Sequence, residues 1–281
     1  MLLSDKYPFL TEYFTALLNS PDKPLPQSLL FYGSDFESQY SLALEIARLL
    51  NCRENKEDSC ECLNCKWIRE NTHPAVLTIS KTDNKPEDDD SKTVISIKQS
   101  AMIKNQLVNA SEFHRVYIFC GRDEDNRISG LNALNFQDEA ANSLLKIIEE
   151  PQQGVTFIFI TRFIEDVLPT IASRSQCFFV PARAEVDFDY SEILGVFENY
   201  WEFERRKVFD VSQQLTDLAG TISATKVLEK IQNYMLYLLK ANPKNLRFLH
   251  DIEIAEECKK MLRQGLKAAN VFDDFCLNVI V

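Results

Sequence analysis

Residues 28–50 read SLLFYGSDFESQYSLALEIARLL and decide what kind of fold to expect. The opening run, Ser28 to Tyr32, is short and apolar, as a buried strand is. Gly33 follows it, and apolar residues then recur at helical spacing from Gln39 to Leu50. A strand, a glycine turn and a helix in this order form the unit that binds phosphate in many α/β proteins.

The same alternation continues outward from this unit. Apolar runs predict strands at 76–79, 116–120, 155–161 and 177–180, and helical periodicity predicts helices at 5–18 and 139–150. Residues 95–108 read as the end of a strand that leads into a helix. Strands that alternate with helices indicate an α/β fold with a parallel sheet covered on both faces. The polar stretch 121–135 has too little apolar periodicity for an assignment.

The sequence pattern changes after Pro181, and no further run of residues predicts a strand. Helical periodicity remains at 193–201, 208–218, 223–240 and 252–266. We therefore expect an α/β domain at 1–181 and an all-helical C-terminal domain at 182–281. One broad apolar face in the third helical run forms either an oligomerising collar or the core of an ordinary helical domain; it comprises Val227, Leu228, Ile231, Tyr234, Met235, Leu238 and Leu239.

Composition limits the function classes. The chain has 281 residues, of which 45% are hydrophobic and 26% charged, which excludes wholesale disorder. A net charge of −11 argues against a protein whose own surface supplies most of a DNA affinity. No run approaches the roughly 18 apolar residues that cross a bilayer, and the first residues lack a signal-peptide pattern. We expect a cytoplasmic protein without a membrane partner, whose cysteines stay reduced.

The turn at Gly33 departs from a functional phosphate loop. That loop reads Gly, four residues, then Gly-Lys-Ser/Thr, so that the lysine reaches phosphate and the hydroxyl binds magnesium. Here Ser38, Gln39 and Tyr40 stand at those three positions, and two acidic residues within the loop would repel a triphosphate. A nucleotide site and an ordinary strand-to-helix turn are both conceivable, but an ATPase-type fold that has lost its nucleotide fits best.

The strand at 116–120 also lacks the acidic pair that would hold magnesium beside a nucleotide. Gly121 and Arg122 follow that strand, and Asp123 and Glu124 come two residues later than such a pair would. The sequence therefore predicts no bound ATP and no hydrolysis by this chain.

Four of the eight cysteines fall within the loop region 52–65. Cys52, Cys60, Cys62 and Cys65 supply four thiolates, enough to fill the shell of a tetrahedral structural zinc. The pair Cys62 and Cys65 has the usual two-residue spacer, whereas Cys60 and Cys62 are closer than usual; the alternative is a set of scattered reduced thiols. The other cysteines are expected to be small buried side chains, namely Cys120, Cys177, Cys258 and Cys276.

Residues 168–175 read LPTIASRS and place Arg174 between Ser173 and Ser175, ahead of the strand at 177–180. Taken alone, such an arginine is a solvated surface residue. The sequence offers no Ser/His/Asp or Cys/His arrangement that would indicate a nucleophile.

Taken together, these segments resemble the AAA+ clamp-loader family of bacterial DNA polymerase III. The resemblance covers about the first 180 residues and is carried, in the family's order, by SLLFYG (28–33), the four cysteines, His73-Pro74, AANSLLKIIEEP (140–151), VTFIFIT (155–161) and LPTIASRS (168–175).

The resemblance implies specific roles. Arg174 matches the arginine of the family's Ser-Arg-Cys motif, which reaches as an arginine finger into a neighbouring subunit's ATP site, and Ser175 replaces the motif's cysteine. The resemblance also implies that the four cysteines bind zinc. One branch of the family does not hydrolyse ATP, and the resemblance implies that this chain belongs to that branch. The expected partners are the ATPase gamma/tau subunits and delta, with the sliding clamp and primed DNA reached through the complex.

Two other classes stay open on the sequence. An autonomous AAA+ ATPase is opposed by Gln39 and Tyr40, and a zinc-dependent nucleic-acid-binding protein is opposed by the net charge of −11.

Overall fold

The computed structural model describes residues 8–18, 25–57, 59–87, 89, 95–132, 135–149, 152–181, 193, 195–196, 208–241, 245 and 247–279. The chain divides into two compact units, Met1–Val180 and Pro181–Val281. Most of the helix expected at 193–201 lies outside the described residues.

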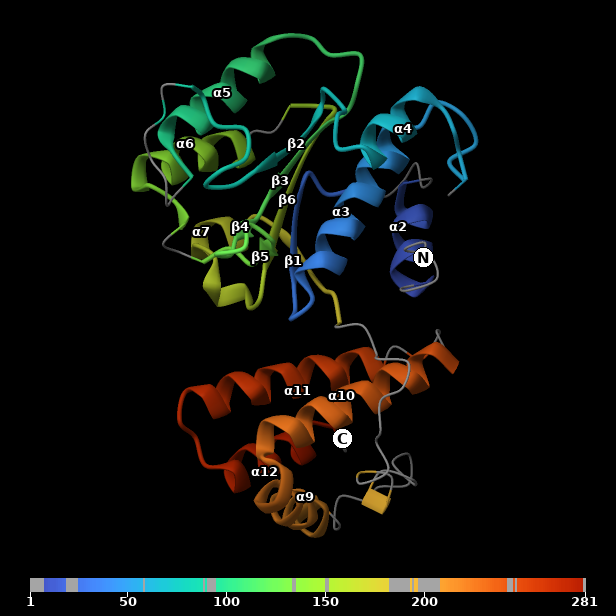
Figure 1. Ribbon diagram of the computed structural model, residues 1–281, viewed down its shortest axis with the longest axis vertical. Helices are drawn as coiled ribbons and strands as arrows, with labels where there is room; N and C mark the ends of the chain where they lie inside the picture. Colours follow the sequence, from blue (N-terminus) through green and yellow to red (C-terminus); the bar gives the residue numbers. More distant parts are fainter. Residues whose placement is uncertain are drawn as a thin grey trace. The chain divides into compact units, whose positions relative to one another are not determined.

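The first unit is built on a five-stranded parallel sheet, which confirms the predicted fold class (Figure 1). Its strand order is β2-β3-β6-β1-β7. The strands are β1 (Ser28–Tyr32), β2 (Val76–Ile79), β3 (Arg115–Phe119), β6 (Val155–Thr161) and β7 (Gln176–Phe179). All seven residues of the central strand β6 are buried, as expected of a parallel strand covered on both faces.

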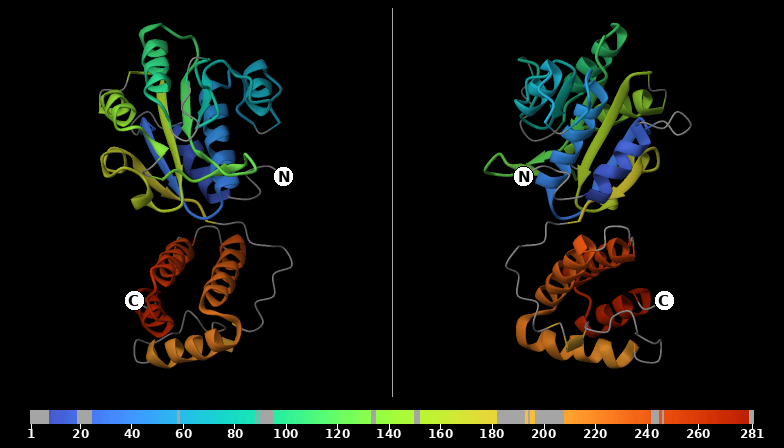
Figure 2. Two further views of the ribbon diagram at one scale, coloured as in Figure 1. Left: turned by 60° about the vertical axis from the view of Figure 1, so that its left-hand side comes forward. Right: turned by 90° about the vertical axis from the view of Figure 1, so that its right-hand side faces the viewer.

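Helices cover both faces of this sheet (Figures 1 and 2). One face packs against α2 (Pro8–Leu18), α3 (Phe36–Asn51) and α4 (Leu63–Arg69). The other packs against α5 (Ile97–Val108), α6 (Asp138–Glu149) and the short segments η2 (Ile164–Asp166) and α7 (Pro169–Ala172). Each face has its own apolar cluster, centred on Ile158 on the α3 side and on Phe157 on the α6 side. Because successive side chains of β6 point to opposite faces of the sheet, this strand contributes residues to both cores.

Several details differ from the sequence expectation, whose helix ranges do not include α4, η2, α7 or the C-terminal residues 268–279. Helix α3 begins at Phe36, three residues before the first apolar repeat, because the side chain of Asp35 caps it. The unassigned stretch after β3 contains a small antiparallel hairpin of β4 (Gly121–Arg122) and β5 (Ile128–Ser129). Strands of two residues are too short to produce a periodic pattern.

In the described residues the second unit has helices and no strands, as predicted. Its long helices are α9 (Val208–Ile222), α10 (Ala224–Ala241), α11 (Arg247–Arg263) and α12 (Ala268–Val279), and each packs against the next while α12 returns to α9. The apolar face of α10 is largely buried, including Val227, Ile231 and Met235. This face therefore serves as the core of the helical unit itself. Among the described helices, none combines the length and apolar character that a bilayer crossing needs.

Candidate functional site

The glycine turn lies at the carboxyl end of β1, between that strand and α3. Gly33 has a φ of +139°, and a Cβ at this position would lie 2.2 Å from the carbonyl oxygen of Val180. The turn thus requires glycine, because the end of β7 passes directly against it.

The N-terminus of α3 is satisfied by a side chain of the loop. Asp35 accepts a hydrogen bond from the Ser38 backbone N–H at 3.0 Å and another from the Ser38 hydroxyl at 2.6 Å. In a functional phosphate loop, free N–H groups at this helix end face the anion. Here a carboxylate of the chain already lies against them.

Gln39, at the position of the phosphate-binding lysine, is completely buried. Its Nε2 donates to the Gly33 carbonyl oxygen at 2.9 Å, so the side chain folds back onto the loop. Its Oε1 is buried without a hydrogen-bond partner in the part of the chain that the structure describes. A neutral amide therefore fills the space beneath the turn.

Tyr40, at the position of the magnesium-binding hydroxyl, points across to β2. Its hydroxyl lies 2.7 Å from Thr78 Oγ1. Burial raises the pKa of the Tyr40 phenol, which further disfavours the phenolate, the stronger ligand for a divalent cation. The hydrogen bond with Thr78 also ties this hydroxyl to β2.

The end of β3 presents a cation where an active site would present carboxylates. Arg122 Nε donates to Asp83 Oδ2 at 2.8 Å in a half-buried ion pair. Asp123 and Glu124, the late acidic residues, are both exposed. At the carboxyl edge of the sheet, polar side chains of the chain therefore bind one another, as in the Arg122–Asp83 ion pair and the Tyr40–Thr78 hydrogen bond.

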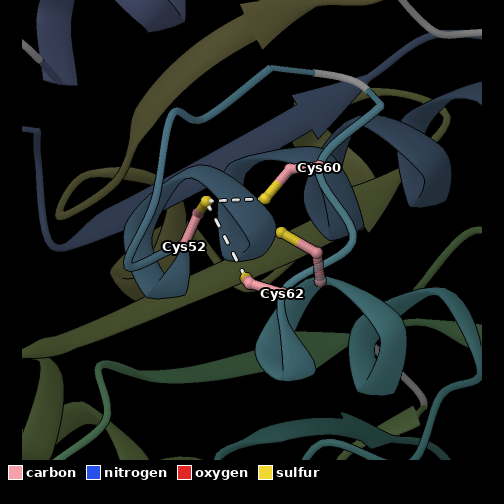
Figure 3. A group of neighbouring side chains, drawn as sticks. Cys52, Cys60 and Cys62 are labelled. Atoms are coloured by element: carbon pink, nitrogen blue, oxygen red, sulfur yellow. Dashed lines mark hydrogen bonds between the residues drawn. The ribbon is translucent and has the colours of Figure 1, made fainter.

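The structure brings all four predicted cysteines together at the other end of α3. Figure 3 labels three of them, Cys52, Cys60 and Cys62. Cys52 follows the last residue of α3, Cys62 precedes α4, and Cys65 lies in the first turn of α4. The sulfur of Cys52 lies 3.6 Å from that of Cys60 and 4.0 Å from that of Cys62. The four Sγ atoms all lie within 4.8 Å of one another.

These distances fit a single metal ion. Four sulfurs about 2.3 Å from a tetrahedral zinc would be about 3.8 Å apart. Burial raises the pKa of the Cys62 thiol, but hydrogen bonds with Cys65, the Arg53 backbone and Cys60 together lower it more, to about 7. Burial raises the pKa of Cys65, so this thiol needs a bound cation to become a thiolate.

Arg48 anchors the cysteine loop to α3, a role that sequence reasoning missed. It is buried, pairs with Glu45 at 2.6 Å, and donates to the carbonyl oxygens of Lys56 at 3.1 Å and Glu57 at 2.9 Å. Its Nη1 also lies 3.9 Å from the sulfur of Cys65. A positive charge there offsets part of the negative charge of clustered thiolates.

Arg174 lies just after α7 with its side chain 37% exposed. Nη1 donates to the carbonyl oxygen of Thr170 at 3.0 Å and is 3.3 Å from Ser173 Oγ. Nη2 lies 2.5 Å from Glu149 Oε1. These contacts hold the guanidinium at the surface of the unit.

Ser175 fixes this segment to the sheet. Its hydroxyl donates to the carbonyl oxygen of Ile171 at 2.9 Å and lies 2.8 Å from the hydroxyl of Ser28, the first residue of β1. Since β7 runs parallel to β1, Arg174 lies at the amino end of the strands and Gly33 at the carboxyl end. At about 3.3 Å per residue, the two edges are roughly 15 Å apart.

Comparison with known proteins places these features in a family. The family model described as "DNA polymerase III, delta subunit" matches residues 12–183, which span the sheet, the cysteine cluster and Arg174. The chain belongs to this family.

Two individual proteins are similar to this delta-subunit family member at low sequence identity. DNA polymerase III subunit delta' of Bacillus subtilis is 29% identical over 163 residues, which make up 57% of this chain and 44% of that protein. The matched part is thus less than half of that relative's length. A solved structure of a DNA polymerase III gamma subunit-related protein from Thermotoga maritima covers 96% of this chain and 98% of its own, at 16% identity and a TM-score of 0.39. Likeness at that level adds nothing to the functional argument.

Replacing the buried anchor tests how the cysteine loop is held. Arg48→Met should lower the free energy of unfolding by about 3–5 kcal/mol, because it leaves Glu45 and two loop carbonyls without their partner. Arg53→Met is the matched control: Arg53 pairs with Glu112, both side chains are well exposed, and its loss should cost less than about 1 kcal/mol. Equal losses in urea denaturation would show that Arg48 does not anchor the loop.

Proposed function

We propose that this chain is a non-hydrolysing, delta-prime-like subunit of the DNA polymerase III clamp loader. In this role it donates Arg174 in trans to the ATP site of a neighbouring ATPase subunit while the sliding clamp is loaded onto primed DNA. It is thus an accessory subunit of the DNA polymerase III holoenzyme and not an enzyme on its own. The observation that carries the proposal is the Gln39 side chain folded onto the Gly33 carbonyl.

A closed phosphate loop argues against the alternative of an autonomous AAA+ ATPase. A triphosphate at the turn would have to displace the Asp35 carboxylate from the N-terminus of α3 and find no lysine to meet it. It would also meet no acidic pair at the end of β3 to hold its magnesium.

The position of Arg174 favours action on another chain. It lies at the edge of the sheet opposite to the chain's own phosphate loop, and its guanidinium is partly exposed. A guanidinium is permanently charged and forked, which suits it to phosphate oxygens in a neighbouring site.

The partners in this proposal are the other clamp-loader subunits, gamma/tau and delta, and through them the clamp and DNA. The net charge of −11 supports a division of labour in which other subunits provide most phosphate contacts to DNA. The same charge disfavours the alternative of a zinc-dependent nucleic-acid-binding protein.

We further propose that Cys52, Cys60, Cys62 and Cys65 hold one structural zinc. Four thiolates fill a tetrahedral shell and leave no position for water or substrate, so such an ion stabilises the loop and does no chemistry. The clustering of the four sulfurs supports this assignment.

The arginine finger is tested in a reconstituted clamp loader. In Arg174→Ala, the fast phase of DNA-stimulated ATP hydrolysis from one neighbouring site should disappear, since a trans arginine is worth about 10³–10⁵ in rate. Stopped-flow phosphate release measures this phase. Arg127→Ala, at an exposed arginine of the β4–β5 hairpin, is the control and should hydrolyse ATP normally. An unchanged fast phase in an intact Arg174→Ala complex would remove the finger role.

The zinc proposal is tested by metal analysis of protein purified under reducing conditions. We expect about one zinc per chain, loss of that zinc in Cys65→Ser, and a fall in stability of about 4 kcal/mol when free zinc is near 1,000 times its Kd. Cys177→Ser, at a half-buried cysteine outside the cluster, should keep the metal. Zinc-free wild-type protein, or full zinc in Cys65→Ser, would contradict the assignment.

A further inference from the structure

Glu149 is the last residue of α6 and lies within the LLKIIEEP segment that carries part of the family resemblance. Its carboxylate pairs with Arg174, which belongs to the other resembling segment, LPTIASRS. Two segments about 25 residues apart in sequence are therefore joined by one ion pair between the ends of α6 and α7. In the described part of the chain, Glu149 has no other ion-pair partner.

The placement of Glu149 is unfavourable in isolation. The C-terminus of a helix carries partial negative charge, so a carboxylate there is destabilised and is normally avoided. Pairing with a guanidinium removes that penalty. The guanidinium also binds α7, since its Nη1 donates to the carbonyl oxygen of Thr170, the second residue of that short helix.

These contacts leave part of the guanidinium free to act. A guanidinium has five N–H donors. Among the described residues, Nη1 has two acceptors, Thr170 and Ser173, and Nη2 has one, Glu149. Nε–H and the second N–H of Nη2 have no acceptor there. The plane of the group is thus fixed by three contacts while donors remain for phosphate oxygens.

We propose that Glu149 is a positioning residue for Arg174: its carboxylate orients the guanidinium so that the remaining N–H groups face the neighbouring subunit's phosphate. The inference rests on the proposed function of Arg174. Glu149 touches no substrate and acts only through the arginine. Because the pair is exposed, its contribution is that of a surface ion pair and is smaller than that of the finger itself.

The test is a double-mutant cycle in the reconstituted clamp loader, with ATP hydrolysis followed at saturating and limiting ATP. Glu149→Ala should lower kcat about two- to fivefold with little change in KM, because orientation matters in the transition state. Glu149→Gln, which keeps an acceptor oxygen, should lie between Glu149→Ala and wild type. Glu139→Ala, at an exposed glutamate in the first turn of the same helix, should leave hydrolysis unchanged.

The cycle separates this inference from the proposed function. In an Arg174→Ala background, Glu149→Ala should have no further effect, since its action passes through the arginine. If Arg174→Ala alone leaves hydrolysis unchanged, the proposed function fails. The positioning role fails if Arg174→Ala slows hydrolysis while Glu149→Ala does not. It also fails if Glu149→Ala slows hydrolysis equally in the wild-type and Arg174→Ala backgrounds. In both cases the proposed role of Arg174 as an arginine finger is retained.

Discussion

The hydrogen bond from Gln39 Nε2 to the Gly33 carbonyl oxygen is the constraint on which the functional account depends. It turns the side chain at the lysine position inward against the turn, while the Asp35 carboxylate caps the N-terminus of α3. In this arrangement the turn presents an amide and a carboxylate where a functional phosphate loop presents a lysine and free N–H groups. This arrangement supports our proposal that the chain acts through other surfaces.

Helix α3 connects the glycine turn with the cysteine loop. Its first turn forms the closed phosphate loop, and its last turn carries Arg48, which holds the cysteine loop through backbone carbonyls. Arg174 belongs to the opposite edge of the sheet, where Ser175 ties it to the beginning of β1. The proposed role of completing a site on a neighbouring subunit rests on this separation between the turn at one edge of the sheet and Arg174 at the other.

The features that could be predicted from the sequence are those set by a local pattern of residues. Apolar runs identified the strands, helical periodicity identified most helices, and the spacing of four cysteines indicated a cluster that the structure brings together. It missed Arg48 and Glu149, because their roles depend on contacts with residues distant along the chain, and a charged residue on a helix surface carries no mark of such a partner. Asp35 is a residue type that commonly caps helices, so the start of α3 at Phe36 could have been predicted. Apolar periodicity alone placed the start at Gln39.

The most direct test of the closed loop is isothermal calorimetry of the purified chain with ATP and magnesium. The account predicts no saturable heat for wild type at millimolar ATP, while a competent ATPase subunit titrated in the same buffer binds. Saturable, magnesium-dependent binding by this chain at micromolar ATP would contradict it, since the nucleotide would then displace Gln39 and Asp35 at little cost.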